Sequence, residues 1–152
     1  MKFKNTLISV TNMEASKEFY KNVLGLHVIA DFGANVTLTG GLCLQTMESW
    51  QELIGKRKIC LGANDAEIYF EEKDFDAFAE KLDAVGVQLV HAVKEHRWGQ
   101  RAVRFYDPDL HIIEVGEDMK SVVRRFLDSG MTDEQVAERM DVPLKYIKAA
   151  KR

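Results

Sequence analysis

The first 119 residues of this chain read as one structural unit written twice, and this duplication limits the possible folds more than any other feature. Asn12 and Asp74, both residue types that favour the start of a helix, lie 62 positions apart. Gly25 and Gly86, both placed where a helix would end, lie 61 positions apart. Start and stop signals that repeat at nearly equal spacing predict two copies of one supersecondary unit.

Each copy has the pattern of a β-α-β-β-β module. In the first, a β-prone stretch at 6–10 precedes a helix at 13–24 and strands at 26–32, 35–39 and 42–47. In the second, a strand at 67–70 precedes a helix from about 74 to 86 and strands at 87–93, 101–106 and 111–115. We therefore predict an α+β domain over 1–118, with modules at about 3–48 and 64–118. Two half-sheets that each bury one face under a helix are expected to form a curved eight-stranded cleft.

The remaining segment, 119–152, has a different texture and predicts a helical extension. It carries 8 Lys+Arg against 5 Asp+Glu, whereas residues 1–119 carry 13 against 19. Thr132 with Gln135 three residues later forms a capping box, and Pro143 is suited to start the next helix. The pattern resembles a helix-turn-helix, yet Leu144, Lys145, Tyr146 and Lys148 offer few base-reading side chains. We favour packing on the body or on a partner subunit over nucleic acid.

Composition and sequence pattern predict a cytoplasmic protein that does not enter a membrane. No apolar run approaches the roughly 18 residues of a transmembrane helix, and the N-terminus lacks the apolar core of a signal peptide. Cys43 and Cys60 stand alone in apolar stretches, without metal or redox spacing. We expect both to be reduced cysteines in the core.

Glu114 is the exception in an otherwise apolar strand. Strand alternation puts it on one face with Ile112, whereas Ile113 and Val115 point to the other. A carboxylate that faces a cleft must be paired, hydrogen-bonded, protonated or metal-bound. The alternative is a glutamate on a solvated strand face.

Several motifs resemble the vicinal oxygen chelate superfamily, which includes glyoxalases, extradiol dioxygenases, fosfomycin-inactivating thiol transferases and bleomycin resistance proteins. They fall in the expected order across 3–118, at 8–13, 16–20, 24–26, 98–101, 105–109 and 114–115. The resemblance implies the paired-module fold and commonly a homodimer. It is specific for fold and weak for function.

The resemblance also implies candidate metal ligands, at Asn5, Gln45, Glu67 and Glu114. Asn5 departs from the histidine usual at its position, so the set is rich in oxygen and suits Mg²⁺ or Mn²⁺ better than Zn²⁺. With a metal bound, Glu67 or Glu114 would be the catalytic base. The alternative is that these glutamates pair with Arg97, Arg101 or Arg104 in a cleft that is empty or holds an organic ligand.

A second candidate site is the run from His96 to Arg101, which places an indole beside imidazole and guanidinium groups. Together these groups could stack on and pair with a flat or anionic ligand. The candidate substrate-binding residues are Gln45, His96, Arg97, Trp98 and Arg101. The alternative is a surface hairpin whose tryptophan covers the core.

Asp107-Pro108-Asp109 predicts a turn before the last strand, where the family usually continues with glycine. Leu110 stands there instead, and leucine tolerates a positive φ poorly. We therefore expect an altered turn with a structural role.

Three functions follow. The favoured one is a small-molecule-binding protein whose ligand lies in the cleft between the modules. The second is a divalent-metal-dependent lyase, isomerase or dioxygenase acting on vicinal oxygens. The third is a ligand-sensing regulator that uses the C-terminal helices on DNA. Enzymatic activity stays open, and no cofactor is certain beyond a possible divalent cation.

Overall fold

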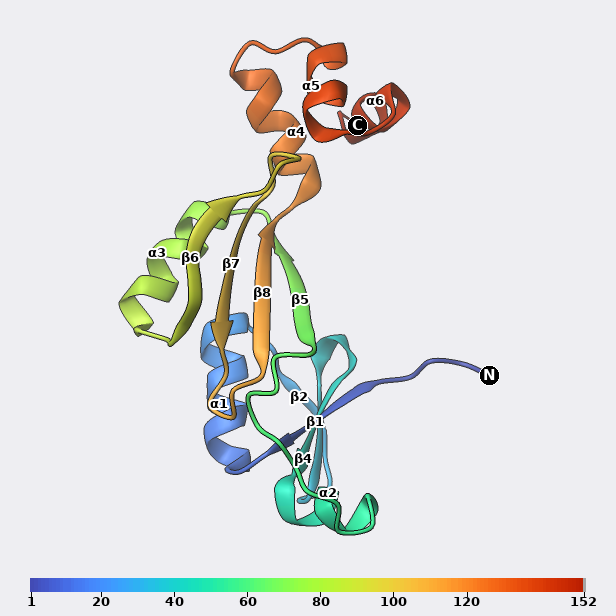
Figure 1. Cartoon of the computed structure of the whole chain (residues 1–152), viewed down its shortest axis with the longest axis vertical. Coiled ribbons are helices and arrows are strands. Elements are labelled where there is room, and N and C mark those ends of the chain that lie inside the picture. The colour runs from blue at the N-terminus through green and yellow to red at the C-terminus, as the bar shows by residue number, and fades with distance from the viewer. Residues whose placement is uncertain (152) are drawn as a thin grey trace. The chain divides into compact units, whose positions relative to one another are not determined.

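The computed structural model describes residues 1–151 and divides the chain into two compact units (Figure 1). Unit 1 comprises Met1–Ala66 together with Tyr106–His111. Unit 2 comprises Glu67–Phe105 and the chain from Ile112 onward. Among residues 1–151, no helix is both long and apolar enough to cross a membrane.

Unit 1 contains the first β-α-β-β-β module. Its elements are β1 (Thr6–Val10), α1 (Met13–Leu24), β2 (Val28–Asp31), β3 (Asn35–Leu38), a short 3-10 turn η1 (Thr39–Gly41), β4 (Leu42–Thr46) and α2 (Met47–Leu53). The sheet order is β1-β4-β3-β2, with β1 parallel to β4 and the other pairs antiparallel.

Unit 2 repeats this arrangement and adds the C-terminal helices. Its elements are β5 (Glu67–Glu72), α3 (Phe75–Val85), β6 (Leu89–Glu95), β7 (Arg101–Tyr106), β8 (Ile112–Glu117), α4 (Met119–Asp128), α5 (Asp133–Met140) and α6 (Leu144–Ala150). The sheet order β5-β8-β7-β6 is that of unit 1 with each strand replaced by its repeat. The predicted α+β class, both modules and the helical extension are therefore confirmed. Strand β8 extends two residues beyond the predicted end, to Glu117.

The helix boundaries follow from the capping residues seen in the sequence. The Asn12 side chain accepts a hydrogen bond from the amide of Ala15 at 3.0 Å, and Asp74 accepts one from Ala77 at 3.3 Å. Gly25 and Gly86 end their helices with φ of 69° and 72°, a left-handed conformation that glycine adopts without a Cβ penalty. The duplication is thus visible in the backbone as well as in the spacing.

Each sheet has one apolar and one polar face. In unit 1 the buried β-strand residues Val36, Leu38 and Leu44 share the core with Tyr20 and Val23 of α1. In unit 2 the core side chains come from α3, β7 and β8, namely Phe75, Phe78, Leu82, Val103, Phe105, Ile113 and Val115. Because side chains alternate along a strand, the intervening residues of both sheets face away from the helix.

The turn after β7 belongs to unit 1 and is held there by a buried aspartate. Asp107 accepts hydrogen bonds from the Tyr20 hydroxyl at 2.7 Å and from the amides of Asp109 and His111 at 2.9 Å. Burial raises the pKa of the Asp107 carboxyl, but hydrogen bonds, His111 first among them, outweigh it and leave the pKa below its usual value. Leu110 adopts a φ of 65°. The expectation of an altered turn is wrong, because the Asp107 bonds hold a leucine in the left-handed conformation.

The two cysteines differ in environment. Cys43, in β4, is buried as expected, and its thiol is free. Cys60 is exposed and also free, so its predicted core position is wrong. It lies in the turn-rich segment after α2, where left-handed residues such as Gly62 and Asn64 interrupt regular structure.

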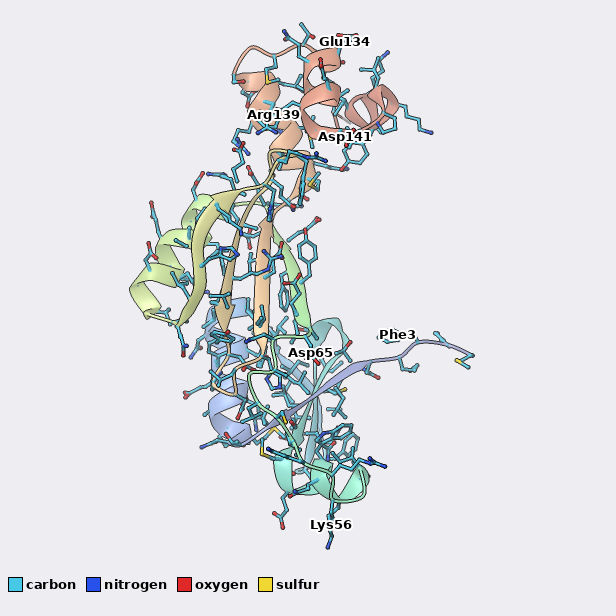
Figure 2. All side chains as sticks on the ribbon, in the orientation of Figure 1. Phe3, Lys56, Asp65, Glu134, Arg139 and Asp141 are labelled. Atoms are coloured by element: carbon cyan, nitrogen blue, oxygen red, sulfur yellow. The ribbon has the colours of Figure 1, made fainter. Side chains whose placement is uncertain are left out.

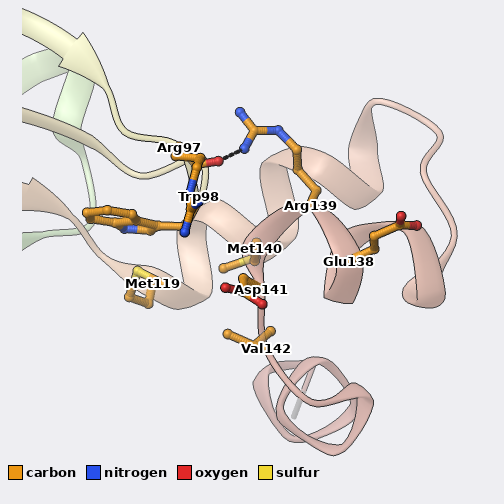
Figure 3. Close-up of a pocket in the computed structure, with 8 residues that line it drawn as sticks. All are labelled: Arg97, Trp98, Met119, Glu138, Arg139, Met140, Asp141 and Val142. Carbon is orange, nitrogen blue, oxygen red and sulfur yellow. Dashed lines mark hydrogen bonds between the residues drawn. The ribbon is translucent and has the colours of Figure 1, made fainter.

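The C-terminal helices have a core of their own. Its buried members are Val122, Val123, Phe126, Val136, Ala137, Met140 and Ile147. Figure 2 shows Glu134 and Asp141 toward the two ends of α5. A pocket of about 530 Å³ lies where α4, α5 and the residues after α5 meet the β6–β7 hairpin, and Trp98, Met119 and Met140 contribute to its wall (Figure 3).

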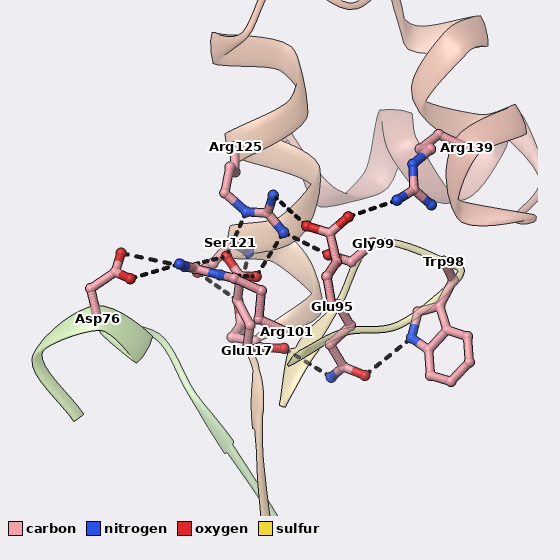
Figure 4. Close-up of polar contacts among 11 residues, drawn as sticks. Asp76, Glu95, Trp98, Gly99, Arg101, Glu117, Ser121, Arg125 and Arg139 are labelled. Atoms are coloured by element: carbon pink, nitrogen blue, oxygen red, sulfur yellow. Dashed lines mark hydrogen bonds and ion pairs between the residues drawn. The ribbon is translucent and has the colours of Figure 1, made fainter. Parts of the chain in front are cut away.

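A network of buried and half-buried charges ties these helices to the sheet (Figure 4). Glu117, 2% exposed, pairs with Arg101 at 3.1 Å and with Arg125 at 2.9 Å. Burial raises the pKa of the Glu117 carboxyl, but hydrogen bonds from Arg125 and Arg101 hold it below its usual value. Arg125 also donates to the carbonyl of Gly99 at 2.6 Å. The extension is therefore fastened to the hairpin.

Gly99, in the β6–β7 hairpin, is in close contact with Phe126 of α4, and substitution of this glycine tests the packing between hairpin and helix. Gly99 has a φ of 88° and lies against the Phe126 ring, so a Cβ added at this position would clash with the ring. We expect Gly99→Ala to lower the free energy of unfolding by about 2–4 kcal/mol, from overpacking plus the positive φ. Urea unfolding followed by circular dichroism measures this.

The matched control is Gly33→Ala, at a glycine with φ of 75° and no atom within 4 Å of the added Cβ. It bears only the backbone cost, about 1 kcal/mol. Equal losses in the two variants would contradict the packing described for Gly99 and Phe126.

Candidate functional site

The polar face of the unit 2 sheet gathers two of the predicted site residues around one arginine. Arg104, in β7, donates from Nε to Glu67 Oε2 at 2.7 Å and from Nη2 to Glu67 Oε1 at 3.4 Å. Its Nη2 also pairs with Glu114 Oε2. The Nη1 atom lies 3.3 Å from Nε2 of His91 in β6. One guanidinium therefore serves two carboxylates and an imidazole.

Strand pairing explains why these residues meet. Strands β5 and β8 are parallel neighbours, with Glu67 opposite Ile112 and Tyr69 opposite Glu114. Arg104 lies on β7, which follows β8 in the sheet order, and pairs in register with His91 of β6. The charged face thus draws one side chain from each of the four strands.

Glu114 is the buried member of this cluster. It is 5% exposed, whereas the Glu67 side chain is 37% exposed. An isolated buried carboxylate is unfavourable by several kcal/mol, and an arginine within hydrogen-bond distance offsets that penalty. Arg104 supplies the counter-charge that the sequence pattern requires for Glu114.

The hairpin that follows β6 lies next to this face. The rings of His96 and Trp98 stack at 4.5 Å with an interplanar angle of 11°. The Trp98 indole donates to Gln100 at 3.1 Å, and Gln100 donates in turn to the Tyr69 hydroxyl at 2.9 Å. Burial, followed by the charges of Arg104, Lys94 and His91, lowers the pKa of His96 below its ordinary value. The hairpin and the charged face therefore share an electrostatic environment.

The two other arginines predicted near the site lie elsewhere. Arg101 pairs with Glu117 and with Asp76, and its guanidinium lies 5.1 Å from the Phe75 ring centroid, on the side of the sheet that α3 covers. Arg97 is exposed at the hairpin tip, and its carbonyl accepts a hydrogen bond from Arg139. It lines the pocket beside the C-terminal helices together with Trp98.

Unit 1 has a polar face of its own. Gln45 is buried, its Oε1 accepts from Asn35 at 2.7 Å, and its Nε2 donates to Ser49 at 2.5 Å. Asn5 is exposed and donates to the carbonyl of Gly41 at 3.3 Å. Asn5, Asn35 and Cys43 line a pocket of about 670 Å³ within this unit. Asn5 and Gln45 thus lie on one face but bind different neighbours.

The register shows which residues of the two modules correspond. Leu7, 62 positions before Tyr69, pairs with Cys43, whereas Tyr69 pairs with Glu114. Cys43 is therefore the counterpart of Glu114 in unit 1, and Gln45 is the counterpart of Gly116. A thiol replaces the carboxylate at the equivalent position.

A divalent metal does not fit the unit 2 cluster while Arg104 is in place. The guanidinium binds Oε2 of Glu67 and Oε2 of Glu114. Two unit charges of like sign about 4 Å apart repel by about 4 kcal/mol at a protein-surface dielectric, and a dication doubles this. Within residues 1–151, no three His, Cys, Asp or Glu side chains are arranged to hold a metal ion.

Sequence reasoning missed two participants, His91 and Tyr69, because no sequence pattern singles them out. The signal for His91 was weak, because only the strand pairing reveals that it lies in register with Arg104. Arg104 was named only as one of three alternatives.

The C-terminal helices α5 and α6 expose charges of opposite sign. Helices α5 and α6 are joined by a three-residue turn with Asp141 at φ 56°. Glu134, Glu138 and Asp141 are exposed on and after α5, while Lys145 and Lys148 are exposed on α6. Exposed carboxylates on one helix of the pair are unfavourable next to a phosphate backbone.

The electrostatics of the hairpin give a direct test. We expect His96 to titrate below 6.5, and Arg104→Gln to raise its pKa, because the substitution removes a neighbouring positive charge. Two-dimensional NMR of the imidazole nitrogens across pH 4–9 follows this titration. Arg101→Gln is the control and leaves the His96 pKa unchanged. A His96 pKa at or above 6.5 in the unmodified protein contradicts the arrangement.

Comparison with known proteins shows which family has this fold. The model of the Glyoxalase-like domain matches residues 3–120. A protein of unknown function from Agrobacterium tumefaciens is similar at 38% identity and a TM-score of 0.71, over 78% of this chain and 95% of that one. About a fifth of this chain therefore has no counterpart in it.

More distant structures share the fold alone. A lactoylglutathione lyase from Agrobacterium tumefaciens is 22% identical with a TM-score of 0.60, over 76% of this chain and 92% of that one. A glyoxalase-related enzyme from Fulvimarina pelagi is 20% identical with a TM-score of 0.67, over 77% and 88%. The family match, which ends at residue 120, leaves most of the helical extension outside it. The chain belongs to the glyoxalase-like family.

Proposed function

We propose that this protein binds a small organic ligand on the polar face of the unit 2 sheet and needs no metal ion to do so. The ligand class that fits is planar and carries a positive charge or several hydrogen-bond donors. The observation that supports this most directly is the cluster of Glu67, Glu114 and Arg104.

The donor and acceptor capacity of the cluster favours such a ligand. Arg104 already directs its nitrogens at Glu67, Glu114 and His91, so it has little capacity left for a ligand anion. Each carboxylate has about four acceptor positions, so Glu67 and Glu114 can accept further hydrogen bonds. Two carboxylates and one guanidinium leave one net negative charge. The unused hydrogen-bonding capacity of the cluster therefore suits a ligand that donates hydrogen bonds.

An aromatic side chain beside the carboxylates supports a flat cation. Tyr69 is 48% exposed and lies directly opposite Glu114 across the parallel strand pair. A tyrosine face next to a carboxylate attracts cations through the ring quadrupole, by about 0.5–1 kcal/mol at exposed sites. The excess of Asp and Glu over Lys and Arg in residues 1–119, 19 against 13, adds a longer-range attraction for the same ligands.

Two broader expectations belong to this proposal. The protein acts in the cytoplasm, and it assembles as a homodimer, as the family resemblance implies. Glu67 and Glu114 then serve as ligand-binding acceptors, and the proposal assigns no chemical step to them. The pocket at Arg97 and Trp98 is separate from the Arg104 cluster in its lining residues.

Benzamidine and benzoate form a matched pair of probes, because both are flat and they carry opposite charges. We expect benzamidine to raise the melting temperature and to bind in isothermal titration calorimetry, with benzoate inactive. Glu114→Gln should weaken benzamidine binding at least about 10-fold, since it removes one charged acceptor. Glu80→Gln, at an exposed position of α3, is the control and leaves binding unchanged. Preferential binding of benzoate would overturn the assigned ligand class.

A further inference from the structure

We propose that the pocket between the β6–β7 hairpin and the C-terminal helices binds a free aromatic α-amino acid. Trp98 of the hairpin receives the aromatic ring, Arg97 binds the carboxylate, and Asp141 after α5 binds the ammonium group. The pocket shares no lining residue with the Arg104 cluster. The inference therefore goes beyond the ligand proposed for that cluster, and the two proposals can fail independently.

The pocket lies within unit 2 and is built in part by the helical extension. Its volume, about 530 Å³, is in the range of small-molecule sites. Its wall joins Arg97 and Trp98 of the hairpin to residues 138–142, at the end of α5. The match to the glyoxalase-like family ends at residue 120. The site is therefore distinct from the ligand positions that the family resemblance implies.

Trp98 provides a preformed surface for an aromatic ring. One face of its indole stacks on the ring of His96 at 4.5 Å. Its Nε1 donates to Gln100 at 3.1 Å, and the buried Gln100 side chain donates in turn to the Glu117 carbonyl at 2.9 Å. The residue is still 39% exposed and lines the pocket. An indole fixed in place before a ligand arrives loses little freedom on binding and stacks well on another ring.

The remaining apolar wall consists of two methionines and a valine. Met140 is buried in the core of the C-terminal helices, and Met119 and Val142 pack against that core. Figure 3 shows Trp98 and Met119 on one side of the pocket and Met140 and Val142 on the other. Thioether sulfurs contact aromatic rings favourably and adapt to their shape. The pocket therefore offers an aromatic ring both an indole and thioethers as contacts.

One charged group of the wall is already used by the fold. Arg139 pairs with Glu95 at 2.6 Å and donates to the Arg97 carbonyl. Its guanidinium also lies 5.4 Å from the Phe126 ring centroid. Two other charged groups of the wall are available, because within residues 1–151 the Arg97 guanidinium and the Asp141 carboxylate form no hydrogen bond or ion pair. Both residues are exposed.

An available cation and an available anion beside an aromatic surface match the charged groups of an amino acid. A guanidinium binds a carboxylate through two parallel hydrogen bonds. An ammonium group has three donors, and the Asp141 carboxylate has about four acceptor positions. Glu138 and the carbonyl end of α5 add negative charge on the Asp141 side of the pocket. The wall therefore favours a zwitterion over a purely anionic aromatic ligand.

The test is calorimetric titration of the full chain with L-phenylalanine and three analogues that each lack one group. Phenethylamine lacks the carboxylate, 3-phenylpropionate lacks the ammonium group, and L-alanine lacks the ring. We expect one equivalent of L-phenylalanine to bind, and each analogue to bind at least about 10-fold more weakly, because each gives up one of the three contacts.

Two-dimensional NMR of the indole N–H groups shows where the ligand binds. The chain has two tryptophans, so two indole signals are expected, and Trp98→Phe assigns them. L-phenylalanine should shift the Trp98 signal. The signal of Trp50, which lies in α2 of unit 1, should stay in place.

Two substitutions separate the charged contacts. Arg97→Gln should weaken L-phenylalanine binding at least about 10-fold and leave phenethylamine binding unchanged, because phenethylamine has no carboxylate. Asp141→Asn should weaken the binding of both ligands. Asparagine tolerates the left-handed φ of 56° at this position, so the turn is kept. The matched control is Glu134→Gln, at an exposed position of α5 outside the pocket wall, and it leaves binding unchanged.

Several results would overturn the inference. One is a folded chain that binds neither L-phenylalanine nor L-tryptophan. Another is binding of phenethylamine or 3-phenylpropionate as tight as that of L-phenylalanine, which would remove the zwitterion from the proposal. A third is L-phenylalanine binding that persists in both Arg97→Gln and Asp141→Asn, or that leaves the Trp98 signal unshifted. Binding that Glu114→Gln abolishes and Arg97→Gln preserves would place the ligand at the Arg104 cluster instead.

Discussion

A carboxylate placed inside a sheet must have a counter-charge, and this constraint on Glu114 shapes the polar face of the second module. The strand that carries it is otherwise apolar, and its neighbours Ile113 and Val115 are buried in the core. Arg104 meets the requirement from the adjacent strand and reaches Glu67 and His91 as well. Removing Arg104 leaves the buried charge of Glu114 without this partner, which is the costly outcome for such a cluster. The arginine is therefore the residue on which the face depends.

In a duplicated module, equivalent positions of the two copies can carry residues of different chemistry. Both sheets have one face under a helix and one polar face, because strand alternation fixes that geometry. The polar face of unit 1 is neutral, with Gln45 and Asn35 bonded to each other. That of unit 2 is charged and has a net acidic surplus. The two halves keep one architecture and have diverged in what they can bind.

The fold was largely predictable from the sequence, whereas the site was predictable only in outline. Helix caps at Asn12 and Asp74 and stops at Gly25 and Gly86 depend on local chemistry, which a sequence displays directly. Site geometry depends on which strands pair and in what register, and no local pattern reports that Tyr69 lies opposite Glu114 or that His91 lies level with Arg104. Three arginines were candidates for the glutamates. Arg101 and Arg104 lie three positions apart on β7, so alternation puts them on opposite faces, and Arg101 faces the helix side and binds Glu117.

Tertiary contacts also explain the other differences between expectation and structure. Leu110 keeps a left-handed φ because Asp107 bonds the backbone amides on both sides of it. Glu117 extends the last strand because two arginines from different elements hold its carboxylate. In both cases a buried acid organises its surroundings, and propensity alone argues for a different local structure. The cluster at Arg104 follows the same rule at a position that can meet a ligand.

A double-mutant cycle between Arg104 and Glu114 measures the central interaction most directly. The free energy of unfolding is determined by urea titration for the unmodified chain, Arg104→Gln, Glu114→Gln and the double variant. The account predicts a coupling energy of about 2 kcal/mol or more, since Arg104→Gln leaves the charge of Glu114 without this partner in a desolvated site. Effects that add to within about 0.5 kcal/mol would show that the two side chains do not interact, and would contradict it.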